Sequence, residues 1–152
     1  MEQALVFASI VLGVAIASEL TNLHHLLRSK GTRWHWAQPA FALFVLLNII
    51  AYWWGAADNE GSITFAQFLP IMFQLVMLVL LAAVSLPDEI PEGGIDLAQY
   101  YQDNRRYQWI LASLYFWSIH VGYLSHVLLT SDTARQVIER AGIDTAIGFL
   151  FA

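Results

Sequence analysis

The sequence predicts an all-α integral membrane protein, a polytopic helical bundle with four transmembrane helices. Of its 152 residues, 58% are hydrophobic and only 12% are charged, whereas ordinary soluble domains carry about 25% charged residues. Several long stretches contain no charged residue and exceed the ~20 residues that cross a bilayer. Aromatic residues gather at the ends of these stretches, as they do at membrane–water interfaces. The lipid bilayer is therefore the first partner that the sequence predicts.

Three of the spans follow from the uncharged runs Trp34 to Ala57, Gly61 to Pro87 and Tyr107 to Ser131. Another span is expected near the N-terminus, because the apolar residues around Glu19 outweigh its single charge. In chain order, the spans are expected at about residues 4–27, 34–57, 62–86 and 107–130.

The polar segment before the last span is expected to become helical at Leu97, with Asp96 as the N-cap, and to continue into that span. After the span, residues 131–152 are expected to form either an amphipathic, interfacial tail or the start of a further span. A fifth span of this kind would begin near Asp144. Residues 1–152 as a whole are expected to form a single transmembrane helical domain.

Basic residues decide the predicted orientation, because Lys and Arg collect in short cytoplasmic loops. Five of the seven Lys and Arg lie in the first and third loops: Arg28, Lys30, Arg33, Arg105 and Arg106. Loops 28–33 and 88–106 are therefore expected to be cytoplasmic, which places the N-terminus outside. This bias and the short chain favour the bacterial cytoplasmic (inner) membrane.

Glu19 is the most informative position, because an ionisable residue within a span is costly and faces a bundle interior, a partner or a water-filled cavity. In one interpretation it bonds to Tyr115, Ser113 or a glutamine of another span and holds helices together. In the other it is a proton, ion or ligand site. His120, in the fourth span, presents the same choice between a satisfied core histidine and a ligand or proton relay.

Further polar side chains within the spans extend the hypothesis of a polar interior. Gln67 and Gln74 are seven residues apart and share one face of the third span, while Gln38 and Asn48 lie in the second. If such residues converge, a narrow path for a solute or ion becomes credible. The predicted ligand or ion pathway consists of Glu19, His120, Tyr115, Gln67, Gln74 and Asn48.

The five histidines raise the question of haem or metal, since neutral imidazole binds both. Helical rise places His120 ~15 Å deeper than His24, too far apart for both to ligate one iron. An interfacial cluster is predicted instead, consisting of His24, His25, Arg28, Arg33 and His35. Such a cluster could bind an anionic headgroup, a quinone or a metal. Alternatively, its side chains are only solvated by lipid headgroups. The sequence requires no haem, quinone or metal.

Three functions stay open at this point. The first is a non-catalytic packing or accessory subunit of a homo-oligomer or larger membrane complex, favoured by little extramembrane mass and by a small-residue ridge of Ser9, Gly13 and Ala17, expected to face the interior. The second is a proton- or cation-coupled channel or transporter using Glu19 and His120. The third is a haem-, pigment- or quinone-binding accessory protein of electron transfer.

Two classes of function are disfavoured. No motif of hydrolase or nucleotide chemistry lies within a span, so the expectation leans against an enzyme. Seven Lys and Arg against twelve Asp and Glu give a net charge of −5, which argues against nucleic acid as a partner.

Overall fold

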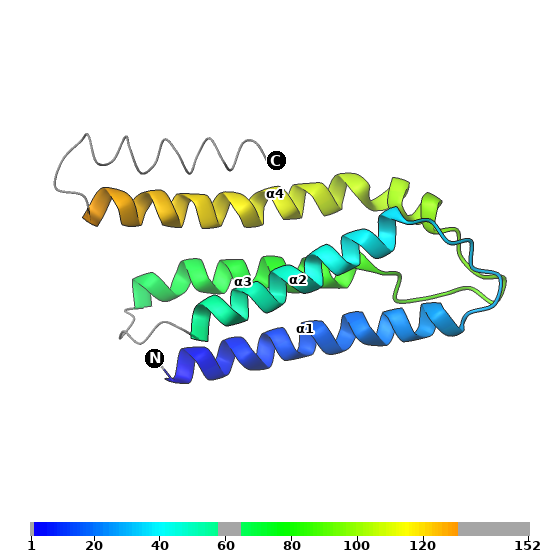
Figure 1. The fold of residues 1–152 in the computed structure, drawn as a ribbon, viewed down its shortest axis with the longest axis horizontal. Helices are drawn as coiled ribbons and strands as arrows, with labels where there is room; N and C mark the ends of the chain where they lie inside the picture. The colour runs from blue at the N-terminus through cyan, green and yellow to red at the C-terminus, as the bar shows by residue number, and fades with distance from the viewer. Residues whose placement is uncertain (1, 58–64, 131–152) are drawn as a thin grey trace. The chain divides into compact units, whose positions relative to one another are not determined.

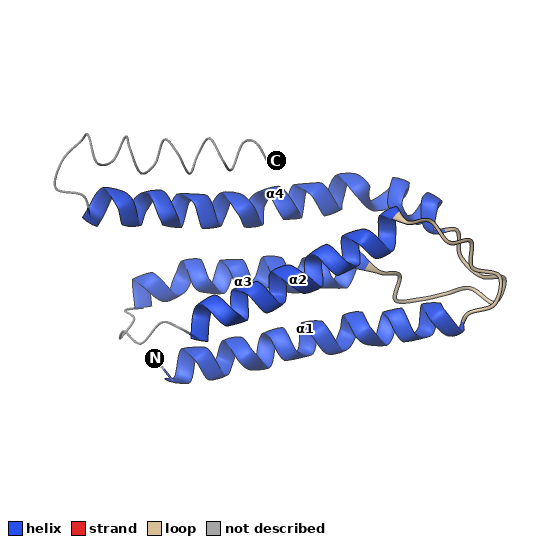
Figure 2. Ribbon diagram, viewed as in Figure 1, coloured by secondary structure: helices blue, strands red, loops and turns tan. Residues whose placement is uncertain are grey.

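A computed structural model of the chain describes residues 2–57 and 65–130, and in these ranges the regular structure is entirely helical (Figures 1 and 2). The helices are α1 (Glu2–Arg28), α2 (Ala37–Ala57), α3 (Phe65–Ser85) and α4 (Leu97–Thr130). The prediction of an all-α helical bundle is thus confirmed. The predicted tail at 131–152, with the further span near Asp144, lies outside the described residues.

Three helices are long and apolar enough to cross a membrane, by length and composition: α1 over Leu5–Arg28, α2 over Ala37–Ala56 and α3 over Gln67–Ser85. They fall on the first three predicted spans, which supports a membrane protein. Helix α4 is not among them, and its first turns carry the charged residues Asp103, Arg105 and Arg106. The fourth span, at 107–130, stays a prediction.

The chain divides into two compact units, Met1–Tyr115 and Phe116–Ala152. In the first unit α1, α2 and α3 pack pairwise against one another (Figure 1), and residues 111–115 of α4 add side chains to the same core. This core consists mainly of Leu12, Ala15, Val45, Ile49, Leu75, Leu78, Leu81, Leu111 and Tyr115. Burial of these side chains holds the first unit together.

Helix α1 buries one of its faces in the core of the first unit. Its buried residues recur every three or four positions, the spacing of a single helix face: Ala8, Leu12, Ala15, Glu19, Asn22 and Leu26. Glu19 therefore lies on the inward face, as predicted. Val6, Ile10 and Val14 are exposed on the outside, as expected for a helix that meets lipid.

Most of the small-residue ridge of α1 does not line the interior, although Ser9 is partly buried and accepts the Trp53 indole N–H of α2 at 3.3 Å. Gly13 and Ala17 are exposed, and a Cβ built on Gly13 would meet nothing within 4 Å. The expectation that the ridge faces inward is wrong, because the buried stripe of α1 runs along its other face.

The loop between α1 and α2 is fastened to the loop between α3 and α4, and we call this arrangement the loop clasp (residues 31–33 and 93–97). The Arg33 N–H donates to the Ile95 carbonyl at 2.9 Å, and the Leu97 N–H donates to the Arg33 carbonyl at 3.1 Å. Gly31 and Gly94 have φ angles of 83° and 85°. The two loops are therefore held in register by backbone bonds.

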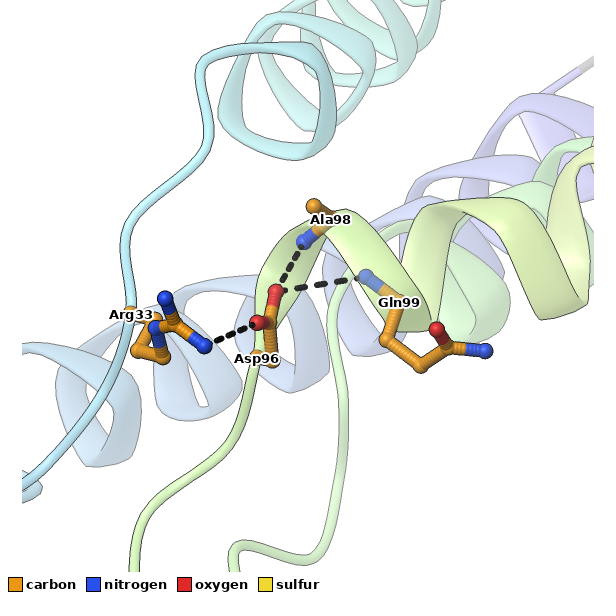
Figure 3. Close-up of polar contacts among 4 residues, drawn as sticks. All are labelled: Arg33, Asp96, Ala98 and Gln99. Carbon is orange, nitrogen blue, oxygen red and sulfur yellow. Dashed lines mark hydrogen bonds and ion pairs between the residues drawn. The ribbon is translucent and has the colours of Figure 1, made fainter.

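Asp96 caps the start of α4, as the sequence predicts (Figure 3). Its Oδ1 accepts the N–H groups of Ala98 at 2.9 Å and of Gln99 at 3.3 Å. Its Oδ2 lies 3.4 Å from the guanidinium of Arg33, in the loop clasp. One carboxylate thus satisfies two free N–H groups of the helix and joins the two loops.

Replacing Asp96 by alanine is expected to lower the free energy of unfolding by about 1 kcal/mol, because the first turn of α4 loses its N-cap. Thermal unfolding in a mild detergent measures the change. Arg33→Gln is the matched control: the Arg33 side chain is 82% exposed, and exposed ion pairs contribute little. Equal losses of unfolding free energy in Asp96→Ala and Arg33→Gln would show that the ion pair, and not the N-cap, stabilises the start of α4.

Candidate functional site

The candidate site is built around the C-terminal end of α3. This helix ends at Ser85 because Pro87 restricts the preceding residue, Leu86, to an extended conformation. The carbonyl groups of a last helical turn have no partner within the helix. Val84 and Ser85 are buried, so partners for their carbonyls must come from other parts of the protein.

Side chains from two other helices supply these partners. The Gln38 amide on α2 donates to the Ser85 carbonyl. On α4, the Gln108 amide donates to the Val84 carbonyl at 3.0 Å, and the Tyr100 hydroxyl donates to the same oxygen at 3.3 Å. Burial raises the pKa of the Tyr100 phenol, and the Asp88 carboxylate adds to the effect, so the phenol keeps the proton that it donates.

Glu19 reaches the same place from α1. Its side chain is only 3% exposed, and its Oε1 accepts a hydrogen bond from the Ser85 hydroxyl at 2.9 Å. The same hydroxyl lies 2.8 Å from the Ala82 carbonyl. A hydroxyl has one proton to donate, so Glu19 shares its single donor with the backbone of α3. Ser85 takes the place of the Tyr115, Ser113 or glutamine partner expected from the sequence.

We call Glu19, Gln38, Ser85 and Gln108 the α3-end cluster. Three of its buried oxygens have no hydrogen-bond partner among the described residues: Glu19 Oε2, Gln38 Oε1 and Gln108 Oε1. Each belongs to a side chain whose other polar atom is anchored on Val84 or Ser85. The three unpaired acceptors therefore lie around one helix end.

The electrostatics of the α3-end cluster are one-sided. The C-terminal end of a helix carries a partial negative charge of about half a unit, and a Glu19 carboxylate adds a full one. One amide N–H of Gln38 and one of Gln108 are directed at carbonyls. The cluster has three unpaired buried oxygens and no cationic residue among its members, which is the arrangement that attracts a cation or a proton.

The other predicted pathway residues of the first unit are Asn48, Gln67, Gln74 and Tyr115. Asn48 donates to the Phe44 carbonyl of its own helix at 2.8 Å. Gln67 is exposed and Gln74 is partly buried, so the expectation that Gln67 faces the interior is wrong. Tyr115 is 3% exposed and packs in the core of the first unit. The side-chain hydrogen bond recorded for Glu19 comes from Ser85.

His120 belongs to the second unit, Phe116–Ala152, where its side chain is partly buried. Its assignment as a relay therefore stays a prediction.

The predicted interfacial cluster is divided among different contacts. His24 and His25 are exposed near the end of α1 with ring centroids 6.0 Å apart, and Arg28 ends the helix. Arg33 pairs with Asp96. His35 accepts the Ala37 N–H at 3.4 Å and stacks on Trp36, so it helps to start α2. Within residues 2–57 and 65–130, no group of three or more His, Cys, Asp or Glu is arranged to hold a metal ion.

Reasoning from the sequence did not assign Gln38, Ser85 or Gln108 to the site, although it noted Gln38 among the polar residues of the second span. A signal existed for Ser85: it ends an apolar stretch just before Pro87, where a helix must stop and leave carbonyls unpaired. Gln108 had no such signal, because its role depends on how α4 packs against the end of α3.

The α3-end cluster thus brings α1, α2 and α4 to one end of α3. No protein-family model matches the sequence, and comparisons with curated proteins and with solved structures give no match. Function must be inferred from the chemistry of these residues.

Proposed function

We propose that this chain is an integral protein of the bacterial cytoplasmic membrane that binds a proton or a small cation at Glu19 and acts in coupled transport. The observation that supports this is the set of three buried, unpaired oxygens around the end of α3. A buried carboxylate without a positive partner is very unfavourable. A proton or a cation removes that charge and supplies what the acceptors lack.

A buried water molecule would supply donors but leave the charge in place, so it meets only half of the requirement. The α3-end cluster contains a single carboxylate, which one proton or one monovalent cation neutralises, whereas a divalent ion would leave an excess positive charge. Carboxylate, amide and hydroxyl oxygens are ligands that hard cations prefer. A proton on Glu19 would instead convert Oε2 into a donor for a neighbouring amide oxygen.

In the predicted orientation, loops 28–33 and 88–106 are cytoplasmic and the N-terminus is outside. Glu19 then lies nine residues, about 14 Å, from Arg28 at the cytoplasmic end of α1. A cation reaching it has crossed a substantial part of the bilayer. His120, in the predicted fourth span, is the second ionisable group that the proposal assigns to the path.

Glu19→Gln tests the proposal directly. In proteoliposomes with an imposed potential and an internal pH or sodium dye, the wild type is expected to show proton or cation flux and the variant only the background of empty vesicles. Glutamine keeps the size of the side chain and an oxygen that accepts from the Ser85 hydroxyl. It also adds N–H donors for the unpaired amide oxygens of Gln38 and Gln108. The variant should therefore unfold at the same temperature as the wild type or higher.

Glu89→Gln is the matched control, since Glu89 is exposed in the loop after α3 and should leave the flux unchanged. Flux in Glu19→Gln equal to that of the wild type would refute coupled transport through Glu19.

A second candidate function, a packing or accessory subunit, is favoured by the outward position of the small-residue ridge of α1. Exposed small residues at Gly13 and Ala17 let the backbone of another helix approach closely, from a second copy of the chain or another subunit. Gly13→Leu is then expected to reduce the assembly size measured by light scattering in detergent. An unchanged size would argue against this candidate without affecting the Glu19 proposal.

A further inference from the structure

A separate pocket of about 390 Å³ opens between the end of α1 and the loop between α3 and α4. Arg28 and Lys30 line it from the α1 side, and Asp88 and Glu92 line it from the opposite loop. The lining is completed by Ile90 and Pro91, which are apolar, and by His25 and Ser29. The pocket therefore presents positive charge on one wall and negative charge on the other.

These charges are available to a ligand. All four charged side chains are exposed, and the ion pair recorded in the described part of the chain joins Arg33 to Asp96 instead. Pocket walls of opposite charge would attract a molecule that carries both signs. A purely anionic ligand would be repelled by Asp88 and Glu92, and a purely cationic one by Arg28 and Lys30.

The position of the pocket along α1 and α3 indicates which part of the bilayer surrounds it. The apolar stretches of α1 and α3 end at Arg28 and Ser85, so the pocket lies just beyond the expected hydrocarbon boundary, at the level of lipid headgroups. The loop clasp joins the two loops that carry its walls (Figure 1). The walls are thus held together without a ligand.

We propose that this pocket binds the headgroup of phosphatidylethanolamine. The phosphate would face Arg28 and Lys30, and the ammonium group would donate to the carboxylates of Asp88 and Glu92, both through charge-assisted hydrogen bonds. Phosphatidylglycerol offers the phosphate without the ammonium group. Phosphatidylcholine carries a quaternary nitrogen that has no N–H to donate. The pocket should therefore distinguish among the three lipids.

Native mass spectrometry of the detergent-purified full chain tests the proposal, with the three lipids carrying identical dioleoyl chains. The wild type is expected to retain phosphatidylethanolamine about tenfold better than either of the others. Asp88→Asn/Glu92→Gln should bring retention of phosphatidylethanolamine down to the level of phosphatidylglycerol. Arg28→Gln/Lys30→Gln should weaken retention of all three, because all carry a phosphate.

Glu89→Gln and Arg105→Gln are the controls, since each removes one charge of the same sign from an exposed residue that does not line the pocket. They should keep the wild-type preference. Equal retention of the three lipids by the wild type, or an undiminished preference in Asp88→Asn/Glu92→Gln, would overturn the proposal. Neither result bears on Glu19, which lies in a different part of α1.

Discussion

Gly94→Ala is expected to lower the free energy of unfolding by about 2 to 4 kcal/mol. Two costs combine at this position. Gly94 has a φ of 85°, a conformation that residues with a Cβ rarely adopt. The Cβ of an alanine would also lie 2.3 Å from the carbonyl carbon of Gly31 and 2.4 Å from its oxygen. Those are backbone atoms held by the loop clasp, so they cannot turn aside as a flexible side chain would.

The neighbouring glycine provides the control. A Cβ on Gly93 would meet nothing within 4 Å, so Gly93→Ala should unfold at the wild-type temperature or slightly higher, since alanine reduces the freedom of the unfolded chain. Thermal unfolding in detergent, followed by tryptophan fluorescence, compares the two variants. Gly31→Ala should resemble Gly94→Ala, because its Cβ would lie 2.7 Å from the Gly93 carbonyl oxygen. A Gly94→Ala protein as stable as Gly93→Ala would contradict the packing of the clasp.

The helices could be predicted because their signals are local. Apolar runs of bilayer length located α1, α2 and α3, and Asp96, as a residue type that caps helices, indicated the start of α4. The loop clasp could not be predicted in this way. It pairs Gly31 with Gly94, more than sixty residues later in the chain, and neither glycine carries a local sign of its partner.

The candidate site was predictable in part. Glu19 follows the inward spacing of Leu12 and Ala15 on α1, so its burial could be inferred from periodicity. Its hydrogen-bond partner could not, because Ser85 becomes a donor only once α3 ends beside α1. Asn48, which was expected to join Glu19, donates to a carbonyl of its own helix instead, an outcome that spacing alone does not reveal.

Ser85→Ala is the second change with a large expected effect, a loss of about 2 kcal/mol in the free energy of unfolding. The Ser85 hydroxyl is the donor recorded for Glu19 among the described residues, and both side chains are buried. Alanine would leave both carboxyl oxygens of Glu19 without a partner, in a region that already contains unpaired amide oxygens. Ser113→Ala, at an exposed serine of α4, should have little effect on the same thermal measurement.

The double variant Glu19→Met/Ser85→Ala separates the loss of a hydrogen bond from the loss of packing. Methionine has a length similar to that of glutamate and no buried acceptor, and replacing both members of a buried polar pair by apolar groups is often nearly neutral. The double variant should therefore recover most of the stability that Ser85→Ala loses. If the free-energy losses of Glu19→Met and Ser85→Ala, measured separately, simply add in the double variant, Glu19 and Ser85 do not interact. Recovery would show that the unpaired carboxyl group is what destabilises Ser85→Ala, the same unmet requirement that a bound proton or cation is proposed to fulfil.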